Sequence, residues 1–112
     1  MRNRVVLVPF PFDDLTGKKV RPAVCLTDAV GGHRHVVLAF ITSVVPPTLE
    51  PTDLLLDPGS AGFALTGLRV RSALRLHRMV TVSATIIQRQ LGVLTPSLQV
   101  QVQQRLRTLF AL

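Results

Sequence analysis

Residues 20–42 read VRPAVCLTDAVGGHRHVVLAFIT, with two strongly apolar runs on either side of a diglycine. Two successive glycines favour a two-residue hairpin turn between antiparallel strands. With residues 31–32 as that turn, the numbers of paired residues add up to 63, so Arg21 lies opposite Thr42. Directly opposed side chains have Cβ atoms roughly 4.5–5.5 Å apart. A fixed cation beside a hydroxyl is suited to holding a phosphate.

Length and composition predict one domain over residues 1–112, with a real hydrophobic core. The chain has 112 residues, of which 47% are hydrophobic, and this length is usual for a single domain. No apolar run approaches the roughly 20 residues that span a bilayer, and the basic start followed by Asp13 and Asp14 is unlike a signal peptide. The lone Cys25 lies in an apolar run, which predicts a reduced, buried thiol in a cytoplasmic protein.

Charge is distributed unevenly along the chain. The formal net charge is +7, and all six acidic residues precede residue 58. Residues 1–57 also contain six basic residues and are neutral overall, whereas residues 58–112 contain seven arginines and no acid. This asymmetry indicates a polyanionic partner or an acidic protein partner. The alternative explanations of this charge asymmetry are a need for solubility, or the arginine richness that a GC-rich coding sequence produces.

The apolar pattern predicts mostly short strands. Besides the hairpin strands at 20–27 and 35–43, strands are expected at 4–8 and 54–57, and residues 44–51, with three prolines, read as a loop. Residues 68–77 alternate cleanly between apolar and basic side chains, which predicts a strand with one core face and one basic stripe. The residues expected on the basic face are Arg69, Arg71, Ala73, Arg75 and His77.

Two helices are expected near the C-terminus. Ser83 can cap a short helix at 84–90, and a short strand at 92–94 follows. Thr95 and the proline after it have the pattern of an N-cap and a first helical residue. Helical spacing then places four apolar residues on one face: Leu98, Val102, Leu106 and Leu109. The predicted class is mainly β with minor α, a small, partly open barrel with a short helix and a C-terminal helix.

Several of these segments, in this order, resemble the PemK/MazF toxin family. The matching segments are VVLVPFPF at 5–12, RPAV at 21–24, AFITS at 39–43, SALRL at 72–76 and IIQRQLG at 86–92. The resemblance implies an SH3-like (CcdB/MazF-like) barrel, a homodimer, and the toxin half of a type II toxin–antitoxin pair. It also implies cleavage of single-stranded RNA without a metal or cofactor, by attack of the ribose 2′-hydroxyl. The implied protein partner is a cognate acidic antitoxin, and the complex is expected to bind DNA.

The resemblance assigns the catalytic roles to Arg21 and Thr42 and maps a second functional arginine onto Arg75. Some family members have an acid two residues after that arginine, where this chain has His77. The residues expected to bind RNA or assist catalysis are Lys18, Lys19, Ser43, Arg75 and His77. The structural alternatives are an Arg21 paired with Asp13 or Asp14, a Thr42 that is an ordinary strand residue, and loop lysines that only face solvent.

Cleavage through the 2′-hydroxyl requires a base, an acid and charge stabilisation on the phosphorane. A guanidinium supplies the charge stabilisation and is a poor proton carrier, so Arg21 is interpreted as a clamp and Thr42 as a donor that orients the phosphate. His77 is the candidate proton carrier, because an imidazole titrates near neutral pH; the alternative is a surface histidine. His33 and His35 are not expected to bind a metal.

Base stacking is restricted by composition, since the chain contains no Tyr or Trp. Four phenylalanines in apolar company are expected in the core: Phe10, Phe12, Phe40 and Phe63. Two other functions stay open. A gyrase poison of the same fold is disfavoured, because that CcdB-like branch is associated with a Trp near the C-terminus. An inactive RNA-binding barrel is the alternative that the sequence separates least well.

Overall fold

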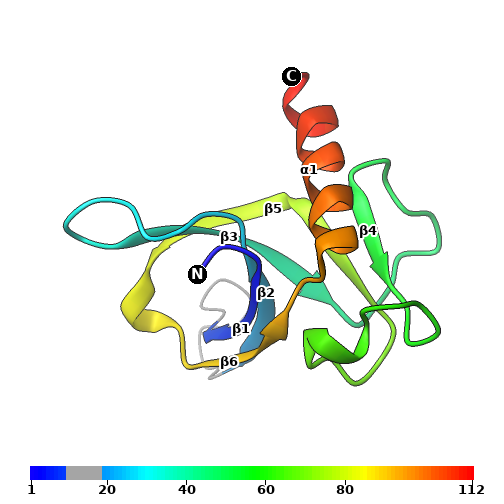
Figure 1. The fold of residues 1–112 in the computed structure, drawn as a ribbon, viewed down its shortest axis with the longest axis horizontal. Coiled ribbons are helices and arrows are strands. Elements are labelled where there is room, and N and C mark those ends of the chain that lie inside the picture. The colour runs from blue at the N-terminus through cyan, green and yellow to red at the C-terminus, as the bar shows by residue number, and fades with distance from the viewer. Residues whose placement is uncertain (10–18) are drawn as a thin grey trace.

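One antiparallel sheet, curled into a half-barrel, dominates the computed structural model, which describes residues 1–9 and 19–112 (Figure 1). In these residues the strands are β1 (Arg4–Pro9), β2 (Val20–Cys25), β3 (His35–Thr42), β4 (Asp53–Leu56), β5 (Ser72–Ser83) and β6 (Arg89–Val93). They are ordered β4-β5-β3-β2-β1-β6 across the sheet. The helical elements are the 3-10 turns η1 (Ala64–Thr66) and η2 (Ala84–Ile86) and the helix α1 (Pro96–Phe110). The expected mainly β class and partly open barrel are confirmed.

The central hairpin has the predicted register and a different turn. Ala23 pairs with Phe40, and the next two pairs keep the sum of 63. The turn, however, spans the four residues 31–34, and Val30 bridges His35 around it. Its first and last residues, Gly31 and Arg34, have positive φ of 75° and 53°. The left-handed pair is therefore Gly31 with Arg34, and not Gly31 with Gly32 as a two-residue turn requires. An irregularity between the turn and the ladder restores the register.

The sheet is apolar on both faces, as the continuous hydrophobic runs predicted. One core cluster includes Val5, Val24 and Leu74 and is covered by α1, from which Leu98 and Val102 are buried. The second cluster fills the inside of the curl with the alternate residues of the same strands: Val6, Val8, Ala23, Cys25, Val36 and Leu38. Burial on both faces explains why these strands read as unbroken hydrophobic runs.

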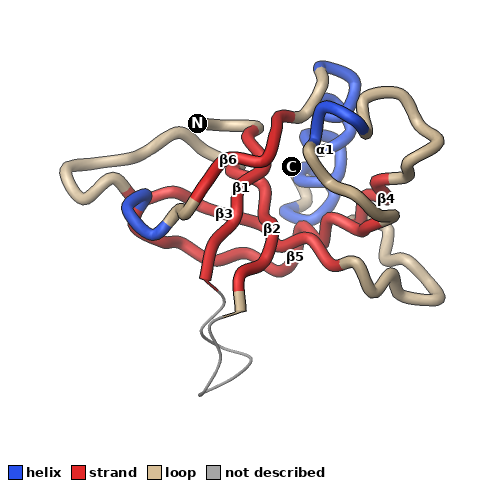
Figure 2. Tube along the Cα trace, turned by 90° about the horizontal axis from the view of Figure 1, so that it is seen from below, coloured by secondary structure: helices blue, strands red, loops and turns tan. Residues whose placement is uncertain are grey.

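The C-terminal helix begins and packs as expected. The Thr95 hydroxyl accepts a hydrogen bond from the backbone N–H of Leu98 at 3.4 Å, and Pro96 is the first helical residue. Leu106 and Leu109 pack against the core from the same face. Figures 1 and 2 place α1 and β4 at one end of the sheet, with the turn at 31–34 projecting at the opposite end. In the described part of the chain, no helix is long and apolar enough to cross a membrane.

The short helix predicted at 84–90 is reduced to the single 3-10 turn η2. Ser83 caps this turn by accepting a hydrogen bond from the N–H of Thr85. Residues 89 and 90 instead join β6, where they pair with Leu7 and Val6 of β1. The strand forms here in place of the expected helix, because β6 satisfies backbone hydrogen bonds along an edge of β1 that would otherwise be open.

The contact between β6 and the segment around η1 requires glycine at two positions, one on each side. Gly67 has φ +74° and ends η1, and a Cβ on it would lie 2.1 Å from the carbonyl oxygen of Leu91. A Cβ on Gly92 would lie 2.1 Å from the carbonyl oxygen of Leu65. The two backbones therefore approach more closely than any side chain permits.

The predicted strand at 68–77 is displaced along the chain. Residues 68–71 lie outside the sheet, β5 begins at Ser72, and Ala73 is fully buried. The basic stripe expected on one strand face therefore does not form, because Arg69 and Arg71 precede the strand.

A large bulge interrupts the pairing of β5 with β3. Ala39 pairs with Met79, but Ile41 pairs with Leu74, so residues 75–78 stand opposite Phe40 alone. Such a bulge leaves residues unpaired and redirects their side chains. The candidate site lies at this bulge.

Candidate functional site

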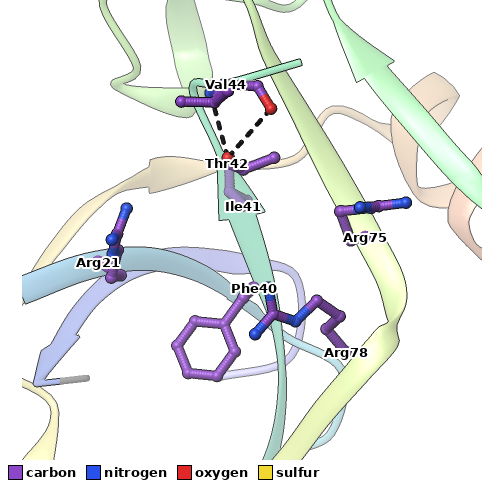
Figure 3. Close-up of a pocket in the computed structure, with 7 residues that line it drawn as sticks. All are labelled: Arg21, Phe40, Ile41, Thr42, Val44, Arg75 and Arg78. Carbon is purple, nitrogen blue, oxygen red and sulfur yellow. Dashed lines mark hydrogen bonds between the residues drawn. The ribbon is translucent and has the colours of Figure 1, made fainter. Parts of the chain in front are cut away.

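A pocket of about 210 Å³ opens where β2, β3 and β5 meet beside the bulge (Figure 3). Among the residues that the structure describes, three of the lining side chains are arginines and one is a threonine. The lining residues are Arg21, Phe40, Ile41, Thr42, Val44, Arg75 and Arg78. A concave site lined by several arginines favours an anionic ligand.

Thr42 ends β3, and its hydroxyl is oriented by the backbone that follows. Its Oγ1 accepts a hydrogen bond from the N–H of Val44 at 3.1 Å and donates to the carbonyl oxygen of Val44 at 3.3 Å (Figure 3). The donated bond is long for an O–H donor, whose usual distance is about 2.7–2.8 Å. A ligand oxygen can therefore replace the carbonyl as acceptor while the Val44 N–H keeps Oγ1 in place.

Arg21 lies in β2 and reaches the pocket from the side opposite β5. It pairs with Val8 in the β1–β2 ladder and is half-buried. The β2–β3 register continues toward Arg21 and Thr42, and both side chains line the pocket. The structure thus brings together the two residues that the sequence analysis assigned to catalysis.

Arg75 also lines the pocket, but its guanidinium is bound to a carboxylate on the neighbouring strand. Its Nε and Nη2 each lie 3.2 Å from an oxygen of Asp53, whose side chain is completely buried. The same carboxylate accepts a hydrogen bond from the N–H of Glu50 at 2.8 Å. Figure 3 shows the Arg75 guanidinium turned away from Phe40. The sequence analysis missed Asp53, although an acid next to the apolar run 54–56 is a recognisable signal.

Arg78 is the pocket residue that the sequence analysis did not single out. It is exposed, ends the bulge, and points its guanidinium toward the ring of Phe40 (Figure 3). Phe40, which was expected in the core, is half-buried, packs against the second core cluster and also lines the pocket. Alternation alone could not reveal Arg78, because the bulge changes which side chains of β5 face the pocket. Phe40 lies two residues before Thr42 and so shares its face of β3.

The other predicted site residues lie outside the pocket lining. Lys19 and Ser43 are exposed, and Lys18, Phe10 and Phe12 lie outside the described residues. His77 is exposed, and its Nδ1 lies 3.8 Å from an oxygen of Asp53.

The two histidines of the hairpin turn region were considered as a metal pair. The rings of His33 and His35 stack with centroids 5.8 Å apart. In residues 1–9 and 19–112, no group of three or more His, Cys, Asp or Glu residues is arranged to hold a metal ion.

Comparison with known proteins identifies relatives over nearly the whole chain. A family model described as the PemK-like, MazF-like toxin of type II toxin–antitoxin systems matches residues 1–110. Among curated protein sequences, none matches the chain significantly.

Solved structures show the same fold at low sequence identity. The Mycobacterium tuberculosis toxin MazF-mt6 superposes with a TM-score of 0.74 at 22% identity, over 97% of each chain. An endoribonuclease in complex with its cognate antitoxin, from a mycobacterial species, has a TM-score of 0.70 at 17% identity, over 100% of this chain and 95% of that one. A further mycobacterial endoribonuclease has a TM-score of 0.68 at 17% identity, over 100% of this chain and 91% of that one.

Proposed function

The chain belongs to the PemK-like, MazF-like toxin family of type II toxin–antitoxin systems, and from that premise we propose that it is a metal-independent endoribonuclease that cleaves single-stranded RNA. The observation that supports this most directly is the pocket in which the guanidinium-bearing Arg21 and the hydroxyl-bearing Thr42 lie together. This is the electrostatic environment that a scissile phosphate requires.

In the proposed reaction the RNA supplies its own nucleophile. The 2′-oxygen attacks the adjacent phosphorus and loses its proton to water, and the bond from phosphorus to the 5′-oxygen breaks. The leaving 5′-oxygen takes up a proton from solvent. The products are a 2′,3′-cyclic phosphate and a 5′-hydroxyl, so atoms and charges balance without a metal or cofactor.

Arg21 and Thr42 divide the stabilisation of the phosphorane between them. The Arg21 guanidinium is permanently charged and can donate to two phosphate oxygens at once. Thr42 donates to a third oxygen when its hydroxyl proton turns from the Val44 carbonyl to the phosphate. Donors held in place before the reaction stabilise the transition state without reorganisation, and one such donor is typically worth about 10²–10³ in rate.

The half-buried ring of Phe40 supports recognition of a single strand rather than a duplex. Its ring borders the pocket, and an unpaired base can stack on an aromatic face that a paired base cannot reach. Base stacking is worth about 1–3 kcal/mol per base. A base next to the scissile phosphate is the proposed occupant of this face.

The proposed protein partner is an acidic antitoxin segment that occupies the same cationic surface. The chain has a net charge of +7, and Arg21 and Arg78 line the pocket. An acidic segment bound there excludes RNA by competition for the same guanidinium groups. A homodimer of the chain is part of this proposal, and several large apolar side chains are exposed, among them Val44 and Leu65.

The decisive experiment treats a mixed-sequence RNA with the purified protein in excess chelator and maps the ends of the products. We expect cleavage at discrete sites with cyclic-phosphate ends, lost in Arg21→Ala and retained in Arg107→Ala. Arg107 is an exposed arginine of α1 and serves as a charge-matched control. Binding without cleavage would instead indicate an RNA-binding barrel, and growth inhibition without cleavage or RNA binding would indicate another target, such as gyrase.

A further inference from the structure

We propose that Arg78, rather than Arg75, is the second guanidinium that contacts the RNA, and that Arg75 serves mainly to hold Asp53. This inference rests on the proposed ribonuclease function and names a residue of the same pocket. It is carried by the different directions of the two arginine side chains, which lie three positions apart in one bulge.

Arg75 belongs to the junction between β4 and β5. Asp53 pairs directly with Arg75 across the two strands, and two bonds of 3.2 Å join the guanidinium to the carboxylate. Because the Asp53 side chain is fully buried, loss of its cation would leave an uncompensated buried charge. In the sheet order, β4 lies on the side of β5 away from β3. The bond to Asp53 therefore directs the Arg75 guanidinium away from Phe40 and Thr42, as Figure 3 shows.

The same junction extends to the C-terminal helix. The Nε of Arg105 in α1 donates to the backbone carbonyl of Asp53 at 2.9 Å. The Asp53 carboxylate also accepts from the N–H of Glu50. Asp53 thus joins β5, the loop before β4 and α1, and Arg75 neutralises it. Release of Arg75 toward a ligand would remove the guanidinium that neutralises this buried carboxylate.

Arg78 has the opposite geometry. The pairing of β4 with β5 ends at Arg75, so no described residue of β4 stands opposite Arg78 in the ladder. Its side chain is exposed and its guanidinium points toward the pocket ring of Phe40. A guanidinium beside an aromatic ring can stack on the same base as the ring and also donate to the adjoining phosphate. The bulge places Arg78 across the pocket from Arg21.

The test compares Arg78→Ala with the paired variant Asp53→Asn/Arg75→Met, which removes both charges of the buried ion pair and so leaves no carboxylate without its cation. Arg21→Ala and Arg107→Ala are the active-site and surface controls. Two quantities are measured below the melting temperature of every variant. They are the cleavage rate and the affinity for a 2′-O-methyl oligonucleotide, which cannot be cleaved.

We expect Arg78→Ala to keep the melting temperature and to lose about tenfold or more in both affinity and cleavage rate, comparable to one base stack. Its log–log salt slope should become shallower by about 0.7, one phosphate contact on a single strand. The paired variant should keep both quantities within about threefold. Arg75→Lys, which retains the charge opposite Asp53, provides a second variant and should behave in the same way.

The opposite pattern would overturn the inference: full activity and affinity in Arg78→Ala with a large loss in Arg75→Lys or in the folded paired variant. Failure of the wild type to cleave any RNA would reject the ribonuclease proposal alone, because the affinity measurements still compare the two arginines. A wild type that neither cleaves nor binds the oligonucleotide would reject both.

Discussion

The backbone N–H of Val44 donates a 3.1 Å hydrogen bond to Oγ1 of Thr42. The hydroxyl of the last residue of β3 is thereby held at the pocket by the backbone that follows the strand. Side chains of Ser and Thr commonly make this local contact at strand and helix ends. In the proposed reaction, the hydroxyl and not the methyl group is the functional part of Thr42.

Substitution of Thr42 should therefore separate hydroxyl chemistry from packing. Thr42→Ser keeps the oxygen, and we expect cleavage within about fivefold of wild type. Thr42→Val keeps the shape, and we expect a loss of about 10²–10³ in cleavage rate, the usual effect of removing one transition-state donor. Single-turnover cleavage under chelator measures both, and an active Thr42→Val would exclude the proposed role.

His77 should contribute little to cleavage. It is outside the pocket lining, and its Nδ1 faces the buried Asp53 at 3.8 Å. We expect His77→Ala to cleave within about threefold of wild type at every pH from 5 to 9, with His33→Ala as the control histidine. A loss above tenfold that depends on pH would restore His77 as the proton carrier, because general acid–base catalysis is typically worth about 10²–10⁴.

Gly92→Ala should destabilise the protein strongly. The new Cβ would lie 2.1 Å from the backbone oxygen of Leu65, and this backbone has no flexible end that can move aside. We expect the free energy of unfolding to fall by about 2–4 kcal/mol, near the upper range of overpacking. Chemical denaturation measures the change.

Gly32→Ala is the matched control, because a Cβ at Gly32 has no atom within 4 Å and Gly32 has no positive φ. It should change the free energy of unfolding by no more than about 0.5 kcal/mol. Equal effects of the two substitutions would contradict the close approach of η1 to β6.

The reactivity of the Cys25 thiol should report on unfolding, and its ionisation should lower the stability of the protein at alkaline pH. Burial raises the pKa of its thiol, and the charges of the N-terminal amine and Arg4 only partly oppose this effect. The folded state thus holds the thiol proton more tightly than the unfolded state. The resulting stability is present below the ordinary thiol pKa and is lost as the pH rises through the folded value. We expect slow alkylation at pH 8 in the native state and fast alkylation in denaturant.

The alkaline effect is measured by the difference between wild type and Cys25→Ala. Above about pH 9 the free energy of unfolding of the wild type should decrease more steeply, by up to about 1.4 kcal/mol per pH unit. Parallel curves for the two proteins, or rapid native-state labelling, would contradict the buried position of Cys25.

Local signals in the sequence predicted much of this fold. The cap at Thr95 and the apolar spacing after it located α1, because capping and amphipathic packing act within one element. The β2–β3 register was correct although the turn was not, since the irregularity before Val30 offsets the longer turn. The arginine and threonine of the pocket follow from this register.

The features that the sequence did not reveal depend on pairing between distant segments. The start of β5 and the residues opposite Phe40 are set jointly by β3 and β4, and an alternating pattern at 68–77 contains no information about either partner. The position of Asp53 beside Arg75, and that of Arg78 opposite Phe40, can be seen only when those strands are aligned. Propensity and periodicity describe one strand at a time.

The bulge of β5 has a consequence for how this pocket can diversify. Residues 77 and 78 are exposed and lie outside the described pairings of β5 with β3 and β4, so exchanges there disturb neither the ladders nor the buried core. The wall facing Phe40 can change its charge and size while the barrel stays intact. In the proposed function, substitutions at Arg78, the pocket residue of the two, can therefore alter which nucleotide sequences are accepted while the strand pairing of the barrel is kept.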